Sequence, residues 1–214
     1  MELVVVSCSH DVENEIAIVE AMLLEGLQSF HLRKPHYTTN DYITYLSKIS
    51  PKLRNRIVLH SRHMLANKYA CKGVHVSRKH RRAGLRTKFR LFKLRFFNKK
   101  INISASLQSV EAMEETGRLY DYIFLGPVFE SIEPEARIKR FKTAKLKKHL
   151  RKAPTKVFAH GGISPDKFEM IYKLGFDGVA AQSYIWDSED PLQTYFQLKE
   201  KLLKTEEVMS TQAI

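Results

Sequence analysis

The sequence predicts an α/β protein with a single-domain (β/α)8 fold, a TIM barrel, and three observations lead to it. Eight short apolar runs recur along the 214 residues, and each is followed by a helical or loop segment. Residues Lys156–Ile185 have the pattern of a strand, a turn, a helix and a second strand. A hydrophobic content of 43% supports one sizeable core, and no stretch has the composition of a linker. We therefore assign residues 1–205 to the barrel and 206–214 to a C-terminal tail.

Short runs of apolar and β-branched residues mark the first four strands. These strands are expected at Leu3–Ser7, Ser29–Arg33, Ile57–His60 and Gly73–Val76. Residues that cap or stop helices delimit the helices between them. We expect helices from Asp11 or Asn14 to near Gly26, from Thr38 and Asp41 to Pro51, and within Ser61–Ala70.

The second half of the chain continues this alternation. Strands are expected at Ile101–Ser106, Tyr122–Leu125, Val157–Ala159 and Gly178–Ala181. Helices are expected after Ser109, near Ala144–Arg151, from Ser164 and over Pro191–Leu203, with an irregular charged loop at Ser131–Phe141. Ser164 followed by Pro165 is typical of a helix start, because Ser caps the end and Pro fits the first turn.

A basic stretch, Ser77–Lys100, contains an amphipathic segment. Leu85, Phe89, Phe92 and Phe96 are spaced as on one face of a helix, and Arg86, Arg90 and Lys93 lie around the other side. We expect the aromatic face to pack on the core and the basic face to be solvated. Attachment to a membrane or to nucleic acid is therefore not favoured.

The net charge of +13 is concentrated in one part of the chain. Residues Tyr42–Val110 contain no Asp or Glu and 18 of the 36 Lys and Arg, whereas the rest carries the other 18 bases and all 23 acids. This distribution indicates a local surface that faces polyanions or solvent, rather than a chain that binds nucleic acid throughout.

The composition excludes several classes of protein. No apolar run approaches 18 residues and no signal-peptide pattern is present, so a soluble, cytoplasmic protein is expected. Cys8 and Cys71 are isolated and are expected to be reduced thiols. The nine histidines have no metal-ligand spacing, which predicts no zinc site. The sequence leaves a homo-oligomer open.

Gly161 and Gly162 follow the apolar run Val157–Ala159 and precede the helix expected at Ser164. Paired glycines let a backbone approach a ligand, and a helix start offers N–H groups to an anion. The loops after strands seven and eight are where a barrel of this kind usually holds phosphate. We therefore expect phosphate binding here, with a simple strand-to-helix turn as the alternative.

The order and spacing of several motifs resemble the thiamine-phosphate synthases and their relative, the thiazole tautomerase TenI. The likeness covers nearly the whole chain and rests on FHLRKP (Phe30–Pro35), KGVHV (Lys72–Val76), ISAS (Ile103–Ser106), DYIFLGPVFES (Asp121–Ser131), AHGGI (Ala159–Ile163) and GFDGVAAQS (Gly175–Ser183). The resemblance implies a barrel enzyme that joins a hydroxymethylpyrimidine diphosphate to a thiazole phosphate. It also implies a substrate site formed by His31, Arg33, Ser106, Ser131, Gly161, Gly162, Gln182 and Ser183. Within this set, Arg33 and Ser106 are the candidates for catalysis.

The chain departs from the family pattern at the metal site. His60 and Ser61 stand where the synthases have an Asn-Asp pair, and His80 replaces the second magnesium-binding Asp. Pro35 replaces a pyrophosphate-binding Lys, although Arg33 remains and Lys34 is adjacent. Gln108 replaces the histidine of TenI, and Ser131, Ile132, Glu133 and Pro134 replace a Thr-x-Thr-Lys motif. Magnesium prefers hard oxygen ligands, so we expect no tightly bound metal; magnesium that takes part would arrive with the diphosphate.

His60, Arg62, Lys79 and His80 fall where the metal site would be. Such a cluster could hold a diphosphate directly, because Arg and Lys neutralise its charge, but a solvated basic surface is the interpretation we favour. The leading hypothesis is a synthase-like transferase of thiamine biosynthesis. The alternatives are a TenI-like binder or tautomerase of thiazole phosphate, and a non-catalytic protein that binds anions through the basic segment.

Overall fold

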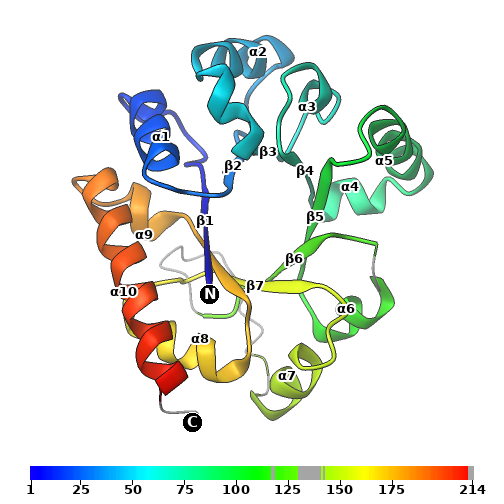
Figure 1. The fold of residues 1–214 in the computed structure, drawn as a ribbon. Coiled ribbons are helices and arrows are strands. Elements are labelled where there is room, and N and C mark those ends of the chain that lie inside the picture. The colour runs from blue at the N-terminus through cyan, green and yellow to red at the C-terminus, as the bar shows by residue number, and fades with distance from the viewer. Residues whose placement is uncertain (117–118, 130–140, 142, 212–214) are drawn as a thin grey trace. The chain divides into compact units, whose positions relative to one another are not determined.

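The computed structural model describes residues 1–116, 119–129, 141 and 143–211. Its strands follow one another as β1 to β8 in a closed parallel barrel, which confirms the predicted (β/α)8 class. Figure 1 traces the alternation of strands and helices along the chain. The chain divides into two compact units, Val5–Ser106 on the one hand and Met1–Val4 with Leu107–Ile214 on the other.

The strands are short and agree with the predicted runs to within two residues at either end. They are β1 Glu2–Val6, β2 Phe30–Leu32, β3 Ile57–Leu59, β4 Gly73–Val76, β5 Asn102–Leu107, β6 Tyr122–Leu125, β7 Lys156–His160 and β8 Gly178–Ala181. Every residue of β2, β3 and β4 is buried, as expected for parallel strands covered on both faces. His75 of β4 pairs with Ser104 of β5, and His31 of β2 pairs with Val58 of β3.

The helices fill the intervals between the strands, and the last two follow β8. They are α1 Glu15–Leu24, α2 Thr39–Lys48, α3 Leu65–Lys68, α4 Arg78–Arg82, α5 Leu85–Phe97, α6 Val110–Thr116, α7 Thr143–Leu150, α8 Phe168–Leu174, α9 Ser183–Trp186 and α10 Pro191–Thr211, with 3₁₀ turns η1 Pro51–Arg56 and η2 Pro165–Lys167. Thr38 and Asp41, where this helix was expected to start, form a capping box at the start of α2. Helix α10 continues beyond Leu203 into the segment that we assigned to a tail.

The predicted packing of α5 is wrong. Its aromatic residues are exposed to solvent, and the buried side chains of the helix are Thr87 and Leu94. A helical period of apolar residues shows that they share a face, but it does not show which face meets the protein. Here the narrow side with Thr87 and Leu94 meets the rest of the unit Val5–Ser106, and the phenyl rings point away from it.

A buried ion pair links the segments that follow β1 and β2. The side chain of Lys34 is fully buried, and its ammonium group contacts the carboxylate of Glu15 and the backbone carbonyl of His10. Tyr45 donates its hydroxyl to the other oxygen of Glu15 at 3.1 Å. Burial raises the pKa of Glu15 in spite of the opposing effect of Lys34, so this pair resides in a strongly desolvated place.

Because the pair is buried, we expect Lys34→Met to destabilise the protein by about 3 kcal/mol, since it leaves the Glu15 carboxylate without its cation. Adding Glu15→Gln to this variant should restore most of the loss. Urea unfolding measures both effects. The control is Lys204→Met, which removes an exposed pair with Glu200 and should change stability by less than about 0.5 kcal/mol. A single Lys34 variant as stable as this control would contradict a structural role for the pair.

His63 is a second buried polar group in the same unit. It is 1% exposed, and its Nε2 lies 3.1 Å from the carbonyl oxygen of His75, so Nε2 carries the proton and donates it. Burial, together with nearby His80 and Arg90, lowers the pKa of His63 to about 4. His63 is therefore neutral in the folded protein at neutral pH.

The low pKa of His63 predicts a loss of stability on acidification. Between the ordinary pKa of 6.5 and about 4, the unfolded chain binds a proton at His63 and the folded chain does not. Stability should therefore fall as the pH falls through this window, by a total of about 3 kcal/mol, and level off below it. Urea unfolding at a series of pH values should show a shallower dependence for His63→Gln than for the unchanged protein. Identical slopes would contradict the prediction.

Candidate functional site

A cavity of about 740 Å³ lies in the unit Val5–Ser106, and segments that follow β2, β3 and β4 form its wall. The lining residues are Arg33, Lys34, Pro35, Tyr37, Thr39, His60, Ser61, Arg62, His63, Met64, Leu65, Ser77, Lys79, His80 and Arg90. We call this the cationic cavity. Since parallel strands end at the same edge of a sheet, the topology itself gathers these three segments.

Arginine and lysine side chains from different segments converge on the cationic cavity. Arg33, Arg62 and Lys79 are exposed, and Arg90 from α5 is half-buried. The backbone of Arg33 is fixed, because its N–H donates to Ser7 Oγ at 2.8 Å and its carbonyl accepts from the same hydroxyl at 3.0 Å. Arg62 has a φ of 50°, a left-handed conformation that is costly for a residue with a side chain. The wall therefore presents several cations on a fixed backbone.

Two histidines complete the wall. The Oγ of Ser77 lies 3.0 Å from Nδ1 of His80, and the rings of His63 and His80 are 4.6 Å apart. Burial, followed by the charges of Arg90 and Lys79, lowers the pKa of His80. Both histidines are thus held toward their neutral forms, and an incoming anion would favour their protonation.

Beside this wall, three histidines from different segments meet in one buried group. His31 Nδ1 lies 2.9 Å from His60 Nε2, and the rings of His60 and His75 are stacked at 4.1 Å. His75 contacts Ser104 Oγ through Nδ1 at 2.9 Å and Ser106 Oγ through Nε2 at 2.7 Å. Residues 104 and 106 are two apart in β5 and therefore lie on the same face of the strand, so both hydroxyls reach one imidazole. The scattered spacing of the histidines did not predict this grouping.

Three histidines grouped in this way are candidate metal ligands. Their ligand atoms lie within 4.8 Å of one another, which is compatible with one ion. A metal bonded to two imidazoles lies close to both ring planes, whereas the rings of His60 and His75 are stacked at only 14° to each other. Such rings share no suitable position near their nitrogens. The group as it stands is a network in which a His31–His60 hydrogen bond and a His75–Ser106 hydrogen bond are joined by the stacked rings of His60 and His75.

The magnesium that the family pattern implies does not fit the cationic cavity. Its lining, among the residues that the structure describes, contains no carboxylate. Ser61 and His80, which the resemblance puts at the positions of the acidic ligands, line the cavity among positively charged residues. Magnesium requires several hard oxygen ligands, so these side chains offer it no tight site.

The second candidate region lies in the unit that contains Leu107–Ile214. Gly161 and Gly162 follow β7 with φ values of 89° and 63°, a region that favours glycine. A Cβ on Gly161 would come within 2.6 Å of Pro127, so this position also lacks room for a side chain. Lys167 donates from Nζ to the carbonyl of Gly162 at 3.0 Å, which places a cation at the turn.

The helix start predicted at Ser164 is observed, with Pro165 in the first turn, but the Ser164 side chain does not cap it. Its hydroxyl instead pairs with Asp166, and this bond lowers the pKa of that carboxylate. Gln182 and Ser183 follow β8 and are half-buried at the start of the short helix α9. Ser131 lies outside the described residues.

The predicted site residues that the structure describes therefore belong to two different units of the chain. Arg33 lines the cationic cavity, His31 is fully buried behind His60, and Ser106 is bonded to His75. The glycine turn belongs to the other unit. Sequence reasoning missed His75 and the inward placement of Arg90. A histidine inside the apolar run GVHV was the available signal for the first, because a buried imidazole needs partners.

Comparisons with known proteins agree with this fold and these motifs. The sequence pattern of the family described as "Thiamine monophosphate synthase" (TMP-TENI) matches residues 3–185. A thiamine-phosphate synthase of Prochlorococcus marinus (strain AS9601) is 24% identical over 193 residues, which are 89% of this chain and 53% of that protein. The chain thus spans about half the length of this curated relative.

Two solved structures share the fold. A thiamine phosphate pyrophosphorylase from Bacteroides thetaiotaomicron superposes with a TM-score of 0.72 at 24% identity, covering 97% of this chain and 98% of that one. A thiamine phosphate pyrophosphorylase from Pyrococcus furiosus gives a TM-score of 0.75 at 20% identity, with 95% and 96% covered. Because the family pattern extends over most of the sequence, from residue 3 to residue 185, the chain belongs to the thiamine monophosphate synthase (TMP-TENI) family.

Proposed function

We propose that the protein is a transferase of thiamine biosynthesis that joins a hydroxymethylpyrimidine diphosphate to a thiazole phosphate. Membership of the family supports this reaction. The observation that carries the proposal is the cationic cavity, which gathers Arg33, Arg62 and Lys79 around a volume suited to a small phosphorylated ligand. A diphosphate is the part of the two substrates that has the most negative charge, so we assign it to this cavity.

In this proposal the side chains replace the metal as the partner of the diphosphate. Arginine binds phosphate oxygens with two parallel N–H donors, and lysine adds a compact charge. His60 and Ser61 supply further polar contacts from the segment after β3. Because His31 is fully buried, we assign its contribution to holding the His60 ring, to which it is hydrogen-bonded.

The reaction requires the C–O bond between the pyrimidine methylene and the diphosphate to break. The thiazole nitrogen then forms a C–N bond to that methylene, and the diphosphate leaves with the bonding electrons. Arg33 would stabilise the leaving charge, and Ser106, oriented by its bond to His75, would donate its hydroxyl beside it. The thiazole phosphate would bind separately at Gly161, Gly162, Gln182 and Ser183, with Ser131 as a further candidate.

One observation favours a second candidate function. The absence of carboxylates from the described lining of the cationic cavity removes the magnesium ligands on which the synthase pattern depends. A TenI-like protein that binds thiazole phosphate without coupling it would not need them. A protein of this kind would retain phosphate affinity at the glycine turn and form no coupled product.

Coupling of the two purified substrates tests the proposed reaction. We expect thiamine phosphate to form, and we expect the rate to depend weakly on magnesium, because the cationic cavity neutralises the diphosphate by itself. Arg33→Gln should lower kcat/KM by about 10-fold or more, since it removes a charge-assisted hydrogen bond. Product is measured by chromatography, with magnesium or with a chelator.

The matched control for this experiment is Arg82→Gln, an exposed arginine of α4 that does not line the cationic cavity. It should leave kcat/KM unchanged. An absolute requirement for magnesium, with tight binding of the ion to the free protein, would contradict the metal-free assignment. Absence of product under all conditions, with thiazole phosphate still bound, would favour the TenI-like alternative.

Gly162→Asp tests the phosphate site. Asp tolerates a positive φ better than most residues, so the barrel should still fold, but its carboxylate would repel the anion. We expect affinity for thiazole phosphate, measured by calorimetry, to fall by on the order of 100-fold. The control is Gly175→Asp, because Gly175 also has a positive φ, in the left-handed region, and has open space around it. Equal affinities for the two variants would rule out phosphate at Gly162.

A further inference from the structure

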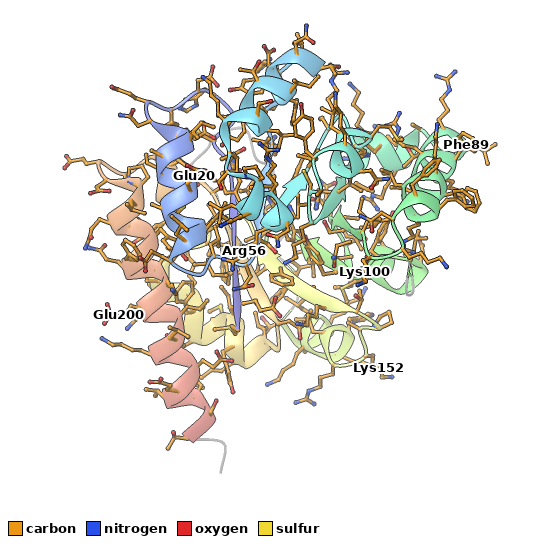
Figure 2. All side chains as sticks on the ribbon, turned by 45° about the horizontal axis from the view of Figure 1, so that its top comes forward. Glu20, Arg56, Phe89, Lys100, Lys152 and Glu200 are labelled. Carbon is orange, nitrogen blue, oxygen red and sulfur yellow. The ribbon has the colours of Figure 1, made fainter. Side chains whose placement is uncertain are left out.

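Helix α5 presents large apolar side chains to solvent. Leu85 is 82% exposed, and Phe89, Phe92, Phe96 and Phe97 are between 65% and 70% exposed. Rings of neighbouring residues contact one another, since the centroids of Phe92 and Phe96 are 6.3 Å apart and those of Phe96 and Phe97 5.4 Å apart. Figure 2 shows Phe89 on the side of α5 that points away from its own unit. Isolated exposed apolar residues are ordinary, but a contiguous group marks an interaction surface.

Apolar, basic and buried residues occupy separate sides of α5. At about 100° per residue, Leu85, Phe89, Phe92 and Phe96 fall within about 60° of one another. Thr87 and Leu94, which are buried, lie on the opposite side. Bases flank the apolar stripe, with Arg86 and Lys93 on one side and Lys88 and Arg95 on the other. The helix therefore has an apolar outer stripe between two basic rows.

The surroundings of α5 are also basic. The preceding helix α4 has the sequence RKHRR, and no Asp or Glu occurs from Tyr42 to Val110. The apolar stripe thus has no acidic neighbour on its own segment. Any partner that covers it must accept phenyl rings in its centre and supply negative charge at its rim.

We propose that the outer face of α5 binds an anionic lipid surface, with the phenyl rings in the acyl boundary and the bases at the headgroups. A helix with these two features lies in the plane of the interface, and long basic side chains reach from its flanks to the phosphates. Each base adds attraction to anionic lipid near the surface. No described helix is long and apolar enough to cross a membrane, so the contact would be peripheral.

The shape and charge of α5 favour lipid over other occupants. A second copy of this face would bring Arg86, Lys88 and Lys93 against the same bases, with no carboxylate from the segment between them. Nucleic acid would use rings spaced along a charged groove, whereas Leu85, Phe89, Phe92 and Phe96 here share one narrow exposed face of a helix. A bilayer accepts a convex ridge and offers negative charge around it.

The test is flotation of the intact protein with vesicles. Vesicles of phosphatidylcholine with about one-third phosphatidylglycerol should carry the protein, and pure phosphatidylcholine vesicles should carry far less. Raising the salt from about 0.1 M to about 0.5 M should weaken the binding, because the headgroup attraction is screened. Replacing Phe89, Phe92 and Phe96 together by Ser should lower the partition coefficient by on the order of 100-fold.

Two controls keep the result interpretable. Leu24→Ser with Met170→Ser removes exposed apolar residues from other helices and should leave the partition unchanged. Thermal unfolding of each variant establishes that it is folded, and Phe92→Trp provides a second measurement. Its fluorescence should shift to the blue on anionic vesicles, against the constant signal of Trp186, which is 5% exposed.

Three outcomes would overturn the proposal. One is no binding, or equal binding to neutral and anionic vesicles. Another is self-association, detected by light scattering, that the triple Ser variant abolishes, because the occupant would then be a second copy. The third is tight binding of single-stranded RNA that depends on the same rings. Salt-sensitive binding to anionic vesicles that the triple variant loses would support it.

Discussion

The buried ion pair between Lys34 and Glu15 determines how the end of β2 meets the segment after β1. The two residues that follow β2 point in different directions, one into the protein and one toward solvent. Lys34 turns into the protein, where it meets Glu15 and the His10 carbonyl, and Arg33 remains exposed at the cationic cavity. Ser7, which directly follows β1, fixes the backbone of Arg33. The position of Arg33 thus depends on Lys34, which need not contact the ligand. It also depends on the Glu15 carboxylate, whose charged form is disfavoured by burial.

In the proposed function, the cationic cavity and the magnesium site of the family pattern are two ways of binding the same diphosphate. Carboxylates hold magnesium, which then neutralises a diphosphate, whereas arginine and lysine neutralise it directly. The two arrangements exclude each other locally, because cations around the cavity would repel a metal and would pair with its carboxylates. Ser61 and His80, which the resemblance puts at the acidic positions, stand among bases such as Arg62 and Lys79, and this is consistent with the second arrangement.

Much of the fold could be predicted because its signals are local. Apolar runs, the Thr38–Asp41 capping box and the glycine turn each depend on a few neighbouring residues, and the parallel order follows from their alternation. The network of His31, His60 and His75 could not, because these residues meet only through strand register. The orientation of α5 was missed for a related reason. A period of apolar residues defines a face, but the partner of that face is decided by the unit against which the helix packs.

Different sides of helix α5 make different contacts, and this limits which residues can be substituted. Thr87 and Leu94 attach the helix to its unit, Arg90 reaches the cationic cavity, and the phenyl rings face outward. An apolar outer stripe lowers solubility and raises the risk of aggregation unless something covers it or charge surrounds it. The basic rows beside the stripe supply that charge, and the same charge selects an anionic partner. Substitution of the rings leaves Arg90 and the buried side intact, so binding at the outer face can be separated from the reaction proposed at the cavity.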